Sequence, residues 1–281
     1  MKTVQTNGAA LATESFGKAD KGTILLVMGA TASMVWWPDE FCSLLADAGY
    51  QVIRFDHRDT GQSSTGMPGD VAYDLHYIAN DLGSILDAYM VRAAHVVGMS
   101  MGGLAAQLFA LEHKARVISL TLIAAEPLGI AYEGEGISDA FMQHFGSMAD
   151  LDWSSHDAVR AFMLTIAELS AGSALPFDRT AALARIETEM ARTSQMQSAF
   201  NHAMVQADLA PDVSAAALDV PVLIIHGTED PIISAKAAQT SAEAIAGSRL
   251  LLLEGRGHEL APADLGRIST AIIDFTDSIA L

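Results

Sequence analysis

The chain has 281 residues, of which 34 are acidic and 16 are basic, so its formal net charge at pH 7 is −18. This acidity argues against nucleic acid and an anionic membrane surface as partners, because phosphate groups repel a negatively charged protein. The single cysteine, Cys42, excludes an internal disulfide framework and a Cys-x-x-Cys metal or redox motif. We interpret Cys42 as a packing residue of a short amphipathic helix.

The N-terminal residues contain no apolar segment typical of a secretory leader, and no apolar run in the chain is long enough to cross a bilayer. We therefore expect a cytoplasmic protein without a membrane partner. Neither charge nor composition decides the oligomeric state, so a homodimer is an open alternative.

Strands alternate with helices in the first part of the chain. Asn7-Gly8 separates two short strand segments, 4–5 and 11–16, which predicts a hairpin at a sheet edge. The apolar run 22–28 is typical of a strand buried on both faces, and the small residues 29–33 after it let backbone amides approach a bound group. The predicted elements that follow are a helix at 39–48, a strand at 51–55, a helix at 74–89, a strand at 93–97, a helix at 102–111 and a strand at 117–124.

The alternation stops between residues 127 and 216, where the sequence predicts only helical segments, at 138–148, 157–169, 180–191 and 193–207. It resumes with a strand at 220–227, a helix at 234–246, a strand at 249–253 and a helix at 263–279. We therefore predict an α/β core domain made of residues 1–126 and 217–281, with a mostly parallel eight-stranded sheet flanked by helices. A helical cap domain, residues 127–216, is inserted after the sixth strand.

The motif Gly98-Met99-Ser100-Met101-Gly102 lies between a predicted strand and a predicted helix. This strand-turn-helix context is what a G-x-S-x-G nucleophile elbow requires. Glycines two residues before and after the serine let the backbone pass through a strained turn without clashes. We predict that Ser100 is a nucleophile.

A serine that attacks an acyl group needs a base to take its proton and an acid to orient that base. Asp230 follows the strand 220–227 and His258 follows the strand 249–253, in the order Ser, Asp, His. Both sites lie at the carboxyl ends of strands, where an open α/β sheet binds its ligands. We predict that Ser100, Asp230 and His258 form a catalytic triad.

Other residues are alternatives for the acid and the base, or lie close to these positions. Glu126 also follows a strand and is an alternative acid, whereas Glu229 is expected to point away from the site. His57 and His226 lie at strand ends, and we interpret both as hydrogen-bonded loop residues. The sequence contains no P-loop, no G-x-G-x-x-G and no H-E-x-x-H motif, so no cofactor and no metal is expected.

The oxyanion of a tetrahedral intermediate needs preorganised hydrogen-bond donors. One predicted donor is the backbone N–H of Met101, at the start of the helix after Ser100. The other is the backbone N–H of Ala30, in the loop after the strand 22–28.

With these motifs in place, the chain resembles the α/β-hydrolase fold superfamily over essentially its full length. Within it, the chain resembles the aclacinomycin methylesterase-like group of serine carboxylesterases, through Val27-Met28-Gly29, Trp37-Pro38-Asp39-Glu40-Phe41, His57-Arg58-Asp59-Thr60-Gly61 and Gly98-Met99-Ser100-Met101-Gly102. The resemblance implies Ser100, Asp230 and His258 as the triad and Ala30 with Met101 as the oxyanion hole. Many relatives carry His-Gly where this sequence has Met28-Gly29.

We expect a carboxylesterase that hydrolyses esters of small to medium size through an acyl-enzyme on Ser100. The alternatives are a carbon–carbon bond hydrolase, a perhydrolase or an acyltransferase with the same triad, and a small-molecule binding protein without catalysis. Carbon–carbon bond hydrolases of this fold often carry Asn before the serine and an aromatic residue after the histidine, whereas this chain has Met99 and Glu259. One of Trp36 and Trp37 is expected to border the pocket. The methionines and aromatics of the cap either line the pocket or pack the cap helices together.

Overall fold

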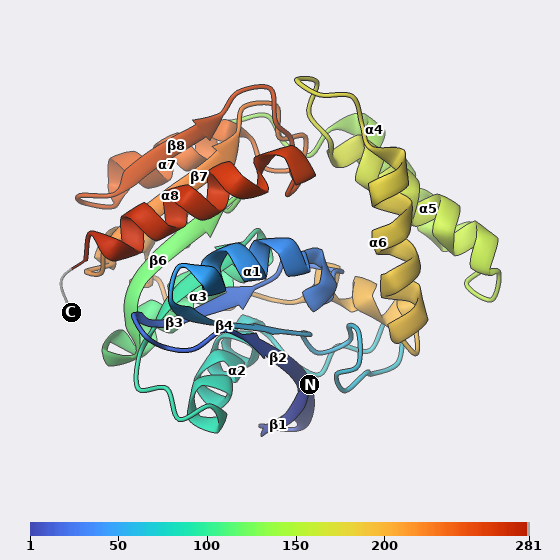
Figure 1. Ribbon diagram of the computed structural model, residues 1–281. Coiled ribbons are helices and arrows are strands. Elements are labelled where there is room, and N and C mark those ends of the chain that lie inside the picture. The colour runs from blue at the N-terminus through green and yellow to red at the C-terminus, as the bar shows by residue number, and fades with distance from the viewer. Residues whose placement is uncertain (280–281) are drawn as a thin grey trace.

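The computed structural model describes residues 1–279 and contains one twisted sheet of eight strands (Figure 1). Their order is β1-β2-β4-β3-β5-β6-β7-β8. The pairs β1-β2 and β2-β4 are antiparallel and the remaining pairs are parallel. The strands are β1 Lys2–Thr6, β2 Ala9–Phe16, β3 Gly22–Val27, β4 Tyr50–Phe55, β5 Ala94–Met99, β6 Val117–Ile123, β7 Val222–Gly227 and β8 Arg249–Leu253. The predicted mostly parallel sheet of eight strands is confirmed.

Helices cover both faces of this sheet, which explains the continuous apolar runs in its central strands. Successive side chains of a strand point to opposite faces, so Leu25 and Val27 pack with α2 and α3, while Ile24 and Leu26 pack with α1 and α8. The bounds of these helices are α1 Asp39–Asp47, α2 Leu75–Ala88, α3 Met101–Glu112, α7 Ala235–Ala244 and α8 Leu265–Asp277. Cys42 is fully buried in the cluster on the α1 side, as its interpretation as a packing residue requires.

The chain between β6 and β7 forms helices that lie together at one side of the sheet (Figure 1). They are α4 Asp139–Gly146, α5 His156–Ser170 and α6 Arg179–Arg192. Buried apolar side chains of α5 and α6, including Phe162, Met163 and Ile186, form a separate cluster with Phe200 from the segment that follows α6. Short 3₁₀ helices complete the described chain: η1 Met34–Trp36, η2 Lys114–Arg116, η3 Ser147–Asp150, η4 Met196–Met204, η5 Ala215–Ala217 and η6 Pro262–Asp264.

Of the helical segment predicted at residues 193–207, the structure has the 3₁₀ helix η4, which covers the shorter range Met196–Met204. Side chains of this segment are bonded to distant loops: Ser198 Oγ donates to the carbonyl of Gly66 (2.8 Å), and Asn201 Nδ2 donates to Asp59 (3.0 Å). These contacts tie the segment to the loop that contains Asp59 and Gly66.

No helix within residues 1–279 is long and apolar enough to span a membrane.

His95 on β5 is buried in the sheet, where its Nδ1 lies 2.8 Å from the hydroxyl of Ser119. Burial lowers the pKa of His95 from 6.5 to about 4. The unfolded chain therefore binds a proton at His95 between these pH values while the folded chain does not. Because the unfolded state then holds more protons at His95, the contribution of His95 to stability must decrease as the pH falls below 6.5.

We predict that His95→Gln makes the protein less sensitive to acid. Each pH unit between the two pKa values is worth about 1.4 kcal/mol, so His95 alone should remove about 2 kcal/mol of unfolding free energy between pH 7 and pH 5. Urea unfolding at both pH values measures the loss in each protein, and the variant should lose about 2 kcal/mol less than the wild type. Equal losses in the two proteins would contradict the assignment of His95 as a buried neutral group.

Candidate active site

Ser100 lies between β5 and α3 with φ 52° and ψ −123°, a left-handed backbone conformation that non-glycine residues rarely adopt. The turn is closely packed: a Cβ atom on Gly98 would lie 2.4 Å from the carbonyl oxygen of Gly102. A Cβ atom on Gly102 would lie 2.3 Å from the carbonyl oxygen of Val27. Only glycine fits at both positions, as the motif predicts.

Asp230 and His258, from the loops after β7 and β8, are hydrogen-bonded to each other. Asp230 Oδ2 lies 2.7 Å from His258 Nδ1, and Asp230 Oδ1 accepts the backbone N–H groups of Ile232 (2.9 Å) and Ile233 (2.8 Å). An ionised carboxylate only accepts hydrogen bonds, so His258 Nδ1 must carry the proton. The imidazole is thereby fixed with Nε2 free to accept a proton.

The environment of Asp230 keeps it ionised. Burial alone would raise the pKa of Asp230, but hydrogen bonds from His226 and His258 outweigh it, and the pKa lies well below its ordinary value. His226 Nε2 lies 2.7 Å from the carbonyl oxygen of Ile233 and 3.3 Å from Asp230 Oδ2. His226 Nδ1 is buried and has no hydrogen-bond partner within residues 1–279. Asp230 is therefore held as a carboxylate in front of His258.

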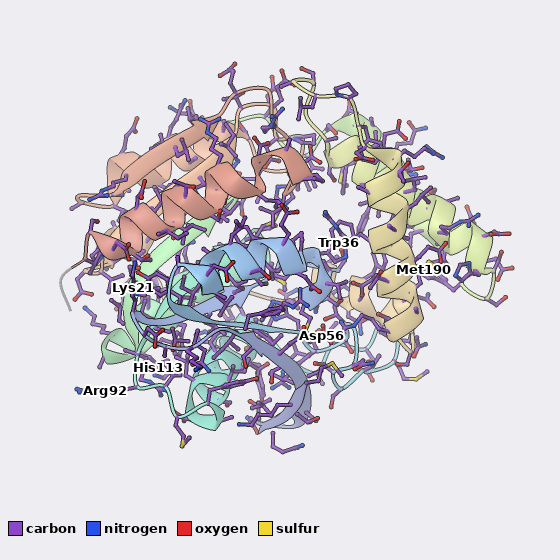
Figure 2. The ribbon with its side chains drawn as sticks, viewed as in Figure 1. Lys21, Trp36, Asp56, Arg92, His113 and Met190 are labelled. Carbon is purple, nitrogen blue, oxygen red and sulfur yellow. The ribbon has the colours of Figure 1, made fainter. Side chains whose placement is uncertain are left out.

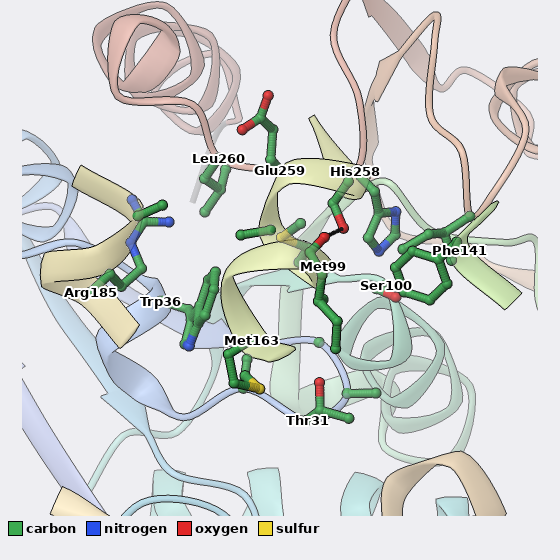
Figure 3. A pocket seen from close by; sticks show the side chains of 18 of the residues that line it. Thr31, Trp36, Met99, Ser100, Phe141, Met163, Arg185, His258, Glu259 and Leu260 are labelled. Atoms are coloured by element: carbon green, nitrogen blue, oxygen red, sulfur yellow. Dashed lines mark hydrogen bonds between the residues drawn. The ribbon is translucent and has the colours of Figure 1, made fainter. Parts of the chain in front are cut away.

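Ser100 and His258 line the same cavity, which has a volume of about 530 Å³ (Figure 3). Ala30 also lines this cavity, whereas Met101 contributes its backbone to the first turn of α3 and no side chain to the wall. Neither Ala30 nor Met101 donates its backbone N–H to a hydrogen bond in the described part of the chain. The structure thus brings Ser100, His258 and Ala30 to one space, with Asp230 directly behind His258.

Apolar side chains from the segment between β6 and β7 form much of the cavity wall. Some methionines and aromatics of that segment line the cavity: Phe141, Met142, Phe145, Met163 and Phe177. Others pack only among the helices, including Trp153, Phe162, Met190, Met196 and Phe200. Trp36 borders the cavity while Trp37 is fully buried, as expected of the pair.

The loop 29–33, which contains Ala30, is bonded to the segment between β6 and β7. The N–H of Thr31 donates to His202 Nδ1 (2.9 Å), and the hydroxyl of Ser33 donates to Glu189 Oε2 (2.5 Å). Arg192 Nη1 bridges the hydroxyl of Ser33 (2.9 Å) and Asp56 Oδ1 (2.6 Å). In Figure 2, Asp56 lies between the sheet and the helix α6 that carries Met190.

The sequence predicts no role for His202, Glu189 or Arg192. No local signal could have found them, because each is one of several polar residues on an irregular or amphipathic segment. Only the folded chain brings them to the loop 29–33.

The alternative residues are engaged elsewhere. Glu126 accepts a hydrogen bond from the hydroxyl of Tyr132 (2.6 Å), and Glu229 accepts from Ser173 on the protein surface. His57 is buried with its Nε2 2.8 Å from the carbonyl oxygen of Met28, so it is a hydrogen-bonded loop residue as interpreted. Within residues 1–279, no cluster of three or more His, Cys, Asp or Glu side chains could hold a metal ion.

Comparison with known proteins shows which family the chain belongs to. A family model described as alpha/beta hydrolase fold matches residues 22–262. Rhodomycin D methylesterase DauP from Streptomyces sp. (strain C5) is 31% identical over 280 residues, which cover 94% of this chain and 93% of that protein. A putative carbamate hydrolase RutD from Pseudomonas savastanoi pv. phaseolicola is 27% identical over 262 residues, which cover 92% of this chain and 95% of that protein.

The solved structures agree on the fold. The esterase RhEst1 from Rhodococcus sp. ECU1013 superposes with a TM-score of 0.79 at 22% identity, covering 99% of this chain and 98% of that one. The resemblance to methylesterases that the sequence motifs indicate is confirmed by the similarity to rhodomycin D methylesterase DauP. The chain therefore belongs to the α/β-hydrolase fold family.

Proposed function

We propose that the protein is a serine carboxylesterase in which Ser100 is the nucleophile, His258 the general base and Asp230 the residue that orients the base. One observation carries the proposal: Ser100, on its strained turn, lines the same cavity as His258, and His258 Nδ1 is hydrogen-bonded to Asp230. Relatives named as methylesterases over nearly the whole chain support ester hydrolysis.

In this mechanism His258 Nε2 takes the hydroxyl proton of Ser100 while the Ser100 oxygen attacks the ester carbonyl. The tetrahedral intermediate collapses, the bond to the alcohol oxygen breaks, and His258 gives its proton to the departing alcohol. Water then attacks the acyl group on Ser100 with His258 again as base. Acid is released, and Ser100 regains its proton.

The oxyanion would be held by the backbone N–H groups of Ala30 and Met101. Each such donor is worth roughly 3 to 4 kcal/mol of transition-state stabilisation when it is preorganised. Met101 stands at the start of α3, where helical N–H groups lack intrahelical partners. The hydrogen bonds that the loop 29–33 donates to His202 and Glu189 would hold the backbone N–H of Ala30 in position.

The segment 127–216 would act as a cap domain over this site. Its residues supply much of the apolar wall, and Phe141 and Met163 lie on the cavity surface with Ser100. A volume of about 530 Å³ suits an ester of small to medium size with an apolar body.

The first test is hydrolysis of p-nitrophenyl esters from acetate to palmitate by the wild type and by Ser100→Ala. We expect turnover by the wild type that peaks at one acyl length, because the cavity has a fixed size. Ser100→Ala should lower kcat by about 10⁴-fold or more, since no acyl-enzyme can form. Circular dichroism confirms that the variant is folded. Wild-type activity retained by Ser100→Ala would contradict the proposal.

A second test replaces Asp230 by Asn. Because Asp230 Oδ1 is fixed by two backbone N–H groups, the new amide would present its NH₂ group to His258 Nδ1. His258 Nδ1 would then accept a hydrogen bond, so Nε2 would carry the proton and could not act as a base. We expect kcat to fall by about 10⁴-fold.

Stopped assays on p-nitrophenyl esters at pH 7 measure this loss, and thermal unfolding serves as the control for folding. A variant with kcat within a few-fold of the wild type would show that Asp230 does not set the tautomer of His258.

A further inference from the structure

Arg185 on α6 lines the cavity that contains Ser100 and His258. Its guanidinium lies over the ring of Trp36, with the guanidinium carbon 5.2 Å from the ring centroid. In Figure 3, Arg185 and Trp36 stand on one side of the cavity and Ser100 and His258 on the other. A permanent positive charge therefore faces a largely apolar space, away from the proposed nucleophile.

Within residues 1–279, the partly buried guanidinium of Arg185 has no carboxylate partner, unlike those of Arg54, Arg58 and Arg192. Arg54 is paired with Glu14 and Asp39, Arg58 with Asp81, and Arg192 with Asp56, each at 2.6 to 2.8 Å. In the part of the chain that the structure describes, Arg185 makes no hydrogen bond and has no carboxylate oxygen within 4.0 Å. Burial lowers the pKa of Arg185, and the charge of Glu259 only partly opposes this effect.

Within residues 1–279, no acidic group of the cavity makes a close contact with Arg185. Glu259 also lines the cavity, and its charge and that of Arg185 act on each other, but burial raises the pKa of Glu259 and no Glu259 oxygen lies within 4.0 Å of the guanidinium. Asp178 lies at the exposed start of α6, where its carboxylate accepts the N–H of Ala181 (2.9 Å). The neighbouring Arg256 is paired with Asp264. Within the described residues, the guanidinium N–H groups of Arg185 therefore have no hydrogen-bond acceptor.

Arg185 is partly buried, and its guanidinium nitrogens are open to the cavity. A partly buried guanidinium without a carboxylate partner gains from a ligand that brings an anion. The planar guanidinium matches a carboxylate with two parallel hydrogen bonds, and its cation–π contact with Trp36 restrains its position in advance. Much of the remaining cavity wall is apolar, with Met163, Ile166 and Leu260 among its residues. A ligand that fits both Ser100 and Arg185 therefore has an ester at one end, a carboxylate at the other and an apolar body between them.

We propose that Arg185 is the anion-recognising residue of this cavity, and that the substrate is a half-ester: a carboxylic ester that carries a free carboxylate remote from the bond to be cleaved. This inference rests on the proposed esterase function and narrows it to a substrate class. The ester lies at Ser100 and the carboxylate at Arg185, with the apolar chain between them. Substrates whose distal group is cationic are disfavoured.

The experiment compares mono-p-nitrophenyl esters of linear dicarboxylic acids with matched esters in which the distal carboxylate is a primary amide. The amide has nearly the same size and keeps hydrogen-bonding capacity but has no charge. For the chain length that spans the cavity, we expect the wild type to prefer the acid in kcat/KM by about tenfold or more. Arg185→Met should abolish that preference, and Arg185→Lys should retain part of it, because an ammonium keeps the charge but not the planar fork.

Glu259→Gln is the matched control variant. If Arg185 serves the substrate, removal of the Glu259 charge should maintain or increase the preference for the acid, since a competing carboxylate is gone. If Arg185 only balances Glu259, the wild type should show no preference for the acid, and the inference is overturned.

Different results would overturn the role of Arg185 and the esterase function. Turnover of acid and amide esters at equal rates overturns the role of Arg185 and leaves the esterase function intact. Absence of turnover with every ester overturns the esterase function. In that case, calorimetry with Ser100→Ala and with Ser100→Ala combined with Arg185→Met decides the inference. A methyl half-ester should bind the first at least about tenfold more tightly, and equal affinity refutes the role of Arg185.

Discussion

The backbone turn at Ser100 is the constraint on which the rest of the site depends. A non-glycine residue at φ 52° is strained by about 1 to 3 kcal/mol, and its surroundings must hold it there. The N–H of Ser100 donates to the carbonyl of Ile123 on β6 (2.9 Å), and Gly98 and Gly102 let α3 start directly against β3. A Cβ atom on Gly29 would lie 3.2 Å from Ser100 Cβ, so the loop after β3 is brought to the serine by the same close packing.

The helical segment between β6 and β7 contacts both loops that flank Ser100. It meets the loop 29–33 through Glu189 and His202, and the backbone N–H of His258 donates to the carbonyl of Ser170 at the end of α5 (2.8 Å). A Cβ atom on Gly257 would lie 2.1 Å from that same carbonyl, so the histidine loop packs directly on α5. Changes in this segment should therefore alter the chemistry at Ser100 as well as the shape of the cavity.

What the sequence predicts well is local. The elbow motif, the strand periodicity and the positions of Asp230 and His258 after strands depend on neighbours in the chain, and the described fold agrees with them. What it misses depends on distant contacts: the side chains of η4 are bonded to a loop far away in sequence, and Glu189 reaches Ser33 only after folding. Arg185 looks like any polar residue of an amphipathic helix, and only the folded structure shows that it faces the cavity and that residues 1–279 give it no carboxylate partner.

The most direct test of the account is covalent labelling with a fluorophosphonate followed by intact-mass measurement and peptide mapping. The probe reacts with a serine only when a base removes its proton and donors hold the developing oxyanion. The account predicts one adduct, on Ser100, in the wild type, much slower labelling of Asp230→Asn, and none of Ser100→Ala. A stable adduct on another residue, or equal labelling of the wild type and Ser100→Ala, would contradict the claim that Ser100 is the activated nucleophile.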